Sequence, residues 1–167
     1  MRTKKKNEFK IGEMVVYPKH GVGEIKRIES LEVEKIKTKF YVVQMEQDKL
    51  VIRVPLEKQD EVGLRKIASK KILNSIFDVL KLKPKIRRIM WSRRAQEYDA
   101  KIHSGDPIKI GEVIRDLFRK NNQPEQSYSE RQMFQIALER LAREVAAIEK
   151  TDYFNATEKI ENILYKR

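Results

Sequence analysis

Residues 50–80, LVIRVPLEKQDEVGLRKIASKKILNSIFDVL, contain the point at which the hydrophobic pattern of the chain changes. The first part, LVIRV at 50–54, is dense in β-branched residues, as expected of a strand. After Val62 the apolar residues recur with a period near 3.6, which is typical of one face of a helix. The residues on this face are Ile72, Leu73, Ile76, Phe77 and Leu80. The sequence therefore predicts that a β domain gives way to an α domain at about 63–67.

The stretches upstream of this point carry the same strand pattern. EMVVY, VGEIKRI and FYVVQM are rich in β-branched or aromatic residues that tend to alternate with polar ones. Turn signals stand between them at 18–21 (PKHG) and 47–49 (QDK). The pattern predicts a small antiparallel β barrel over 9–65, preceded at 1–8 by a basic disordered arm that includes RTKKK.

Residues 66–167 are predicted to form an all-α domain of about five helices, so the fold class is α+β. Pro84 cannot lie inside a helix, so a second helix starts at or after it and runs to about His103. Three further starts are predicted from capping patterns. They are Asp106 followed by Pro107, Ser129 with Gln132, and Asn155 with Glu158.

The composition excludes several classes of protein. The 167 residues include no Cys, which rules out disulfides, thiolate metal sites and thiol nucleophiles. No apolar run approaches the roughly 20 residues that cross a bilayer, and no apolar signal core follows the basic start. We therefore expect a soluble, cytoplasmic protein with no membrane partner. The net charge of +12 points to a polyanion as partner.

The residues needed for catalysis are scarce. The six glycines form neither a phosphate loop nor a dinucleotide-binding fingerprint, which argues against nucleotide hydrolysis. His20 and His103 lie in different predicted domains, and neither has a partner at metal-ligand spacing. We predict no enzyme activity, no metal and no cofactor.

The excess positive charge is concentrated in one quarter of the chain. Residues 81–120 carry 12 basic and 5 acidic groups. Within them, KLKPKIRRIMWSRR at 81–94 holds seven basic groups, no acidic group and the only tryptophan. The candidate DNA-binding residues are Trp91, Lys85, Arg87, Arg88, Arg93 and Arg94.

Two interpretations of Trp91 stay open. A lone tryptophan near Ile89 and Met90 is commonly a core residue, although burying it draws neighbouring cations inward unless they snorkel. An exposed indole in a basic patch can instead stack on a base or wedge between base steps while guanidinium groups hold phosphates. Arg53 in the β domain is equally open, because an edge strand can accept a protein partner's strand and the pattern does not exclude nucleic acid.

The order of the motifs resembles the CarD/CdnL/TRCF family of bacterial transcription regulators, from Phe9 to about Leu164. FKIGEMVVYPKHGVGEI at 9–25, LVIRVP at 50–55 and VGLR at 62–65 resemble the RNA polymerase interaction domain. WSRR at 91–94, SGD at 104–106 and EVIRDLFR at 112–119 resemble the helical DNA-binding domain.

The resemblance implies a Tudor-like β domain that docks on the polymerase β subunit. It implies a helical domain that contacts promoter DNA, largely independently of sequence, at the upstream edge of the transcription bubble. There a tryptophan wedges into the minor groove, a role that falls on Trp91, with Arg93 and Arg94 as phosphate contacts. Arg53 matches a polymerase-contacting arginine. We therefore expect a non-enzymatic monomer that stabilises open promoter complexes and joins the nucleoid through polymerase.

Two positions depart from the family pattern. Leu31 and Gln96 stand where members often carry basic residues. The departure at Leu31 affects part of the polymerase contact, and the departure at Gln96 affects one DNA contact. Two alternatives stay open: affinity for either partner is weaker here, or neighbours such as Lys35 supply it.

Two other functions fit parts of the sequence. A free-standing basic protein that coats DNA or RNA nonspecifically, in the nucleoid or on ribosomes, explains the charge equally well and predicts salt-dependent binding to any duplex. An ATP-driven translocase, as among the repair-coupling members of the family, is disfavoured because no phosphate loop is present.

Overall fold

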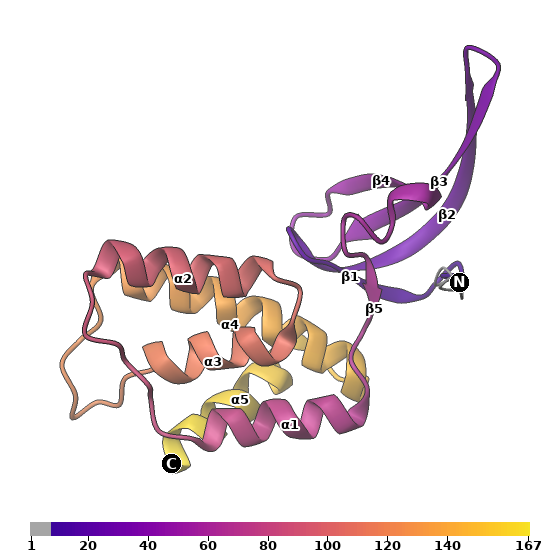
Figure 1. Ribbon diagram of the computed structural model, residues 1–167. Helices are drawn as coiled ribbons and strands as arrows, with labels where there is room; N and C mark the ends of the chain where they lie inside the picture. The colour runs from indigo at the N-terminus through magenta and orange to yellow at the C-terminus, as the bar shows by residue number, and fades with distance from the viewer. Residues whose placement is uncertain (1–7) are drawn as a thin grey trace, which may run out of the picture. The chain divides into compact units, whose positions relative to one another are not determined.

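The computed structural model describes residues 8–167, which form two compact units, with Ile67 ending the first and Ala68 beginning the second (Figure 1). Seven residues of the predicted basic arm, 1–7, lie outside the described residues. The first unit is built of strands and the second of five helices, which confirms the predicted fold class. None of the helices in the described part of the chain is long and apolar enough to cross a membrane.

The first unit is a five-stranded antiparallel sheet with the order β4-β3-β2-β1-β5. The strands are β1 (Met14–Tyr17), β2 (Gly21–Val33), β3 (Ile36–Met45), β4 (Val51–Pro55) and β5 (Arg65–Lys66), with a short 3-10 helix at Leu56–Lys58. Both predicted turns connect strands, at 18–20 and 46–48.

The apolar cluster of this unit lies on one face of the sheet, and Val16, Val22 and Val42 are buried on the other face. Its buried members are Phe9, Val15, Ile25, Tyr41, Val43, Met45, Val54 and Leu64. Gly23 pairs with Met45 in the neighbouring strand, and a Cβ at Gly23 would lie 2.8 Å from Val43 Cγ1 and 2.9 Å from Met45 Sδ. The strands pack closely here because residue 23 has no side chain.

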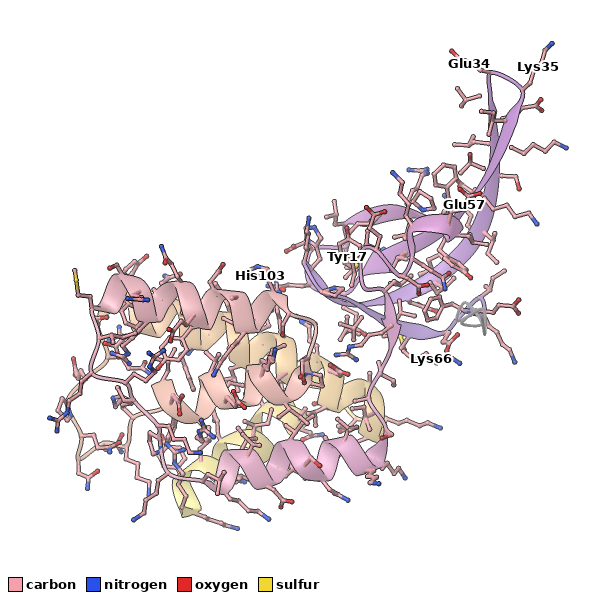
Figure 2. All side chains as sticks on the ribbon, in the orientation of Figure 1. Tyr17, Glu34, Lys35, Glu57, Lys66 and His103 are labelled. Carbon is pink, nitrogen blue, oxygen red and sulfur yellow. The ribbon has the colours of Figure 1, made fainter. Side chains whose placement is uncertain are left out.

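Strands β2 and β3 extend past the rest of the sheet as a two-stranded hairpin (Figure 1). The pairing of β3 with β4 ends at Phe40, whereas β2 and β3 stay paired as far as Val33 and Ile36. Glu34 and Lys35 form a two-residue turn with φ values of 49° and 65°, the backbone that tight hairpins require, and stand at its tip (Figure 2). This turn carries no Gly or Asn, so the sequence analysis did not find it.

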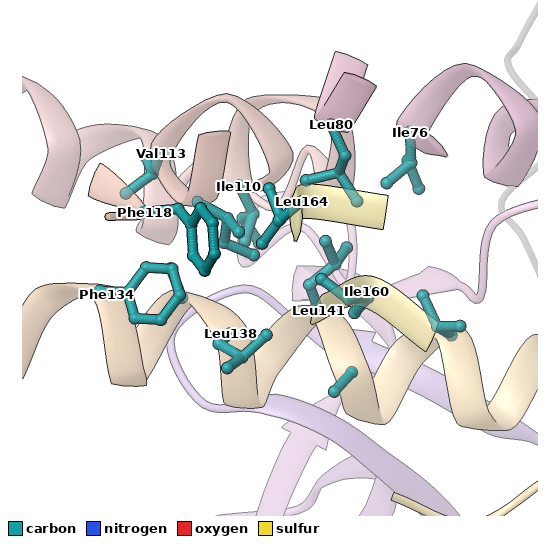
Figure 3. Packing of buried hydrophobic residues seen from close by; sticks show 14 of the residues in the cluster. Ile76, Leu80, Ile110, Val113, Phe118, Phe134, Leu138, Leu141, Ile160 and Leu164 are labelled. Atoms are coloured by element: carbon teal, nitrogen blue, oxygen red, sulfur yellow. The ribbon is translucent and has the colours of Figure 1, made fainter. Parts of the chain in front are cut away.

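The second unit contains α1 (Lys70–Lys81), α2 (Trp91–His103), α3 (Pro107–Leu117), α4 (Tyr128–Glu149) and α5 (Tyr153–Lys166). Its core joins residues from all five helices. Figure 3 shows members from α1, α3, α4 and α5. Ile76, Val113 and Ile160 have no exposed surface. The backbone N–H of Ala68 donates to Glu144 Oε2 at 2.9 Å, so a buried carboxylate of α4 holds the first residue of this unit.

Two of the helix starts differ from the prediction. The cap of α4 is Ser127, whose hydroxyl accepts from Glu130 N at 3.2 Å, and Ser129 lies inside the helix. The cap of α5 is Asp152, which accepts from Asn155 N at 2.8 Å. In each helix a side-chain oxygen before the predicted cap accepts the backbone N–H three residues later. Helix α4 therefore begins two residues, and α5 three residues, sooner than predicted. Asp106 caps α3 as predicted.

Candidate nucleic-acid interface

The basic segment 82–90 between α1 and α2 is irregular, and a buried carboxylate anchors it. The backbone N–H of Lys85 donates to Asp116 Oδ1 at 2.9 Å. The same oxygen accepts from Arg115 Nε at 2.8 Å, and both Arg115 and Asp116 of α3 are buried. Asp116 thereby fixes the position of the chain that leads to Trp91.

Helix α2 begins at Trp91 and ends at His103, in agreement with the prediction that it starts at or after Pro84 and runs to about His103. Met90 occupies the cap position, and no side chain caps the first turn. The Met90 carbonyl accepts from the backbone N–H groups of Arg93 and Arg94, both at 3.1 Å. The first turn therefore presents a tryptophan and two arginines directly after an exposed methionine.

Trp91 is half-buried and packs against the helical core. It is therefore neither a fully buried core residue nor a fully exposed indole, the two interpretations that the sequence left open. Its ring centroid lies 6.2 Å from that of the buried Tyr98, at 47°. The Arg94 guanidinium carbon lies 5.4 Å from the Trp91 centroid and 5.6 Å from the Tyr98 centroid. Arg94 Nη2 also donates to the Tyr98 hydroxyl at 3.2 Å. These contacts hold the indole in one orientation while part of it stays accessible.

The remaining candidate DNA-binding residues surround this ring with positive charge. Lys85, Arg87, Arg88 and Arg93 are exposed. Arg87 pairs with Glu97 at 2.6 Å, whereas among residues 8–167 Lys85, Arg88 and Arg93 form no ion pair. Lys85, Arg88 and Arg93 are consequently the cations most available to phosphates, and Arg94 is placed to orient the indole.

The candidate polymerase contacts lie on the β unit. The register Leu31↔Thr38 and Val42↔Arg53, with two residues per repeat along β3, puts Leu31 and Arg53 on the same face of the sheet. Lys35 stands apart, at the hairpin tip (Figure 2). The structure therefore brings Leu31 and Arg53 onto one surface and places Lys35 at its far end.

Glu29 connects two arginines of this surface. Its carboxylate accepts from Arg27 Nε at 2.6 Å and from Arg53 Nε at 3.1 Å. The hydrogen bond from Arg27, followed by that from Arg53, lowers the pKa of Glu29. Arg53 is consequently oriented by a carboxylate of the same chain.

Several residues of both surfaces escaped the sequence analysis. Tyr98 follows Arg94 by four residues and Trp91 by seven, a spacing that indicates a shared helix face and could have found it. Asp116 and Glu29 act across elements, and no local pattern marks them. Across residues 8–167, no group of three His, Asp or Glu side chains is arranged to hold a metal ion.

Comparisons with known proteins match both units. The CarD-like/TRCF RID domain matches residues 9–68, which fits the predicted Tudor-like β domain, and the CarD C-terminal domain matches residues 75–161. The "Putative transcription factor YdeB" of Bacillus subtilis (strain 168) is 30% identical over 140 residues, covering 84% of this chain and 92% of YdeB. A solved chain described as "CdnLNt from Myxoccoccus xanthus" is 39% identical and covers 40% of this chain and 94% of its own, with a TM-score of 0.33. With both domain matches in order along the chain, and a relative matched over most of its length, the chain belongs to the CarD/CdnL family of transcription factors.

Proposed function

We propose that the chain binds the β subunit of RNA polymerase through its β unit and stabilises the open promoter complex through its helical unit. Trp91 would sit at the upstream edge of the bubble, with Arg88 and Arg93 on neighbouring phosphates. The observation that carries the proposal is a half-buried indole, oriented by Arg94 and Tyr98, inside a segment with seven basic groups and no acidic group.

A fixed indole favours the open state because it has an unstacked base to contact only there. A group that binds both states equally shifts nothing, so only this differential contact counts. Base-aromatic stacking of about 1 to 3 kcal/mol moves the equilibrium roughly 5-fold to 150-fold. No covalent chemistry is required.

Attachment to polymerase explains why the helical unit needs no sequence readout. A tether raises the effective concentration of a weak DNA-binding unit near the promoter. Arg53, Leu31 and Lys35 are the proposed polymerase contacts. Arg53 is the strongest candidate of the three, because Glu29 orients its guanidinium on the exposed face that also carries Leu31.

The lifetime of open complexes, measured with wild type, Trp91→Ala and Trp91→Phe, tests the wedge. We expect wild type to lengthen the lifetime, Trp91→Ala to remove the effect and Trp91→Phe to retain part of it, while all three co-purify with polymerase. An unchanged lifetime with Trp91→Ala contradicts the wedge.

Polymerase capture tests the other surface. Arg53→Glu should weaken capture and leave DNA affinity unchanged, whereas Lys58→Glu, an equal charge change at another exposed residue of the β unit, should leave capture intact. Equal capture by Arg53→Glu and wild type contradicts the assignment. Tight, salt-dependent binding to any duplex without polymerase would instead favour the nonspecific DNA-coating function.

A further inference from the structure

Trp91 by itself offers a restricted apolar surface to DNA. The ring packs against the helical core, Tyr98 lies beside it and the Arg94 guanidinium lies over it. A side chain held on several sides can support an inserted group, but only part of its own surface can enter a base step.

The most exposed apolar side chain of the basic segment belongs to the preceding residue. Met90 is 78% exposed, against 44% for Ile86 in the same segment. A contiguous exposed apolar patch rimmed by polar residues marks an interaction site, whereas a single exposed apolar side chain does not do so by itself. The position of Met90 and the charge around it therefore decide its role. Met90 immediately precedes Trp91, so both residues stand at the start of α2.

Met90 also occupies a position where a methionine is unfavourable for the fold. In α1, α3, α4 and α5 the residue at the cap is Ser69, Asp106, Ser127 or Asp152, and its side chain accepts a backbone N–H. Met90 lacks an acceptor, so α2 begins without this stabilisation. A residue that is unfavourable for local stability, such as a methionine at a helix N-cap, is more readily explained by a role in binding when it lies in a functional surface.

The charge around Met90 identifies the partner. Residues 81–94 carry seven cations and no anion, which suits a polyanion. The accessible apolar surface of a nucleic acid lies on base faces, and these open where a duplex is kinked or ends in an unpaired junction. Methionine is among the side chains that proteins insert between base steps from the minor groove.

We propose that Met90 and Trp91 form a two-residue wedge at the junction, in which Met90 enters the open base step and the accessible part of the Trp91 indole stacks on the unpaired base. This inference rests on the proposed function, because it names a second residue of the same DNA surface. It assigns the Met90 thioether side chain the deeper position and gives the poor helix cap a functional reason.

The first measurement compares wild type with Met90→Asn, Met90→Leu and Ile86→Asn. Asparagine supplies the missing cap, so Met90→Asn should raise the melting temperature while shortening the open-complex lifetime at least threefold relative to wild type. Met90→Leu should keep the lifetime, because it keeps an apolar side chain. Ile86→Asn, a matched change at another exposed apolar residue of the segment, should have less than half that effect.

The second measurement uses the full chain without polymerase. A forked duplex with an unpaired junction is compared with a fully paired duplex of the same length. Wild type should bind the fork severalfold more tightly, and Met90→Asn should lose that preference while keeping its affinity for the paired duplex. Arg88→Gln should weaken both affinities by the same factor, since phosphates are present in both.

The outcomes separate the two proposals. If Trp91→Ala shortens the lifetime and Met90→Asn does not, the two-residue wedge is wrong and the proposed function stands. Equal effects of Ile86→Asn and Met90→Asn also overturn the wedge. If wild type leaves the lifetime unchanged, the proposed function fails. The fork preference then decides the role of Met90, which is contradicted if Met90→Asn retains that preference.

Discussion

Glu29 is the residue whose charge organises the exposed face of the β unit. Its hydrogen bonds from Arg27 and Arg53 favour the ionised carboxylate and hold its pKa below the ordinary value of 4.5. Because the folded pKa is depressed, the contribution of Glu29 to stability is present above pH 4.5 and is lost as the pH falls through the lower folded value.

An NMR titration of the Glu29 carboxyl carbon checks this argument. We expect a midpoint below 4.5 in wild type and a rise towards 4.5 in Arg27→Ala, with a smaller rise in Arg53→Ala. The order follows from Arg27 being the larger cause. A midpoint that neither substitution moves would show that the two arginines do not interact with Glu29 in solution.

Gly23 is a second residue whose role follows from its neighbours. An alanine Cβ would lie 2.8 Å from Val43 Cγ1 and 3.0 Å from the Gln44 carbonyl oxygen, so Gly23→Ala overpacks the sheet. We expect it to lower the free energy of unfolding of the β unit by about 1–3 kcal/mol, measured by urea denaturation. Gly111→Ala is the control, since its Cβ would meet nothing closer than 3.7 Å and alanine favours a helix.

At the scale of the element, α4 tests which serine caps a helix. Ser127 accepts from Glu130 N, whereas Ser129 lies inside the first turn. Ser127→Ala should therefore destabilise the helical unit by about 1 kcal/mol in thermal or urea unfolding, and Ser129→Ala should change it little. The reverse order of effects would restore Ser129 as the cap.

The segment before α2 depends on α3. Asp116 accepts from both Lys85 N and Arg115 Nε, so Asp116→Ala leaves a buried guanidinium without this carboxylate. We expect a loss of about 3–5 kcal/mol in the stability of the helical unit and faster hydrogen exchange at Lys85. Asp116→Asn keeps an oxygen acceptor and should protect Lys85 better than alanine does.

The sequence predicts which segments form strands or helices better than it predicts where each element begins or which side chains of other elements it contacts. Apolar periodicity identified the helices and parts of β1 to β4, because one face of each element is buried, whereas the two-residue strand β5 is too short to carry a pattern. The α4 cap was wrong because Ser127 and Ser129 both precede plausible partners and only the backbone distinguishes them. Trp91 and its cations were found by composition, whereas Glu29 and Asp116 depend on contacts that form only after folding.

At the scale of the whole molecule, the two units have separate cores. The apolar clusters of the β unit and the helical unit share no member. Since Trp91, the only tryptophan, belongs to the helical unit, its fluorescence reports that unit alone. Unfolding need not be a single cooperative transition in such a chain.

Two buried substitutions test this independence. Ile76→Ala should lower the stability seen by Trp91 fluorescence by about 2–5 kcal/mol and leave the amide signals of the β unit unchanged. Val43→Ala, at a residue buried in the other core, should do the opposite. A shift of the fluorescence midpoint by Val43→Ala would mean that the units unfold together.

The contact between Glu144 and Ala68 determines where force enters the helical unit. In the proposed function polymerase is bound by one unit and DNA by the other, and tension would then act along residues 67–68 whenever those two partners move apart. Glu144 of α4 accepts a hydrogen bond from the Ala68 backbone, so that tension would reach α4 as well as the first turn of α1. Helix α4 packs against α2, α3 and α5. On the proposed function we therefore expect the connection to resist unwinding of α1 under load and to transmit the motion of polymerase to the helical unit as a whole.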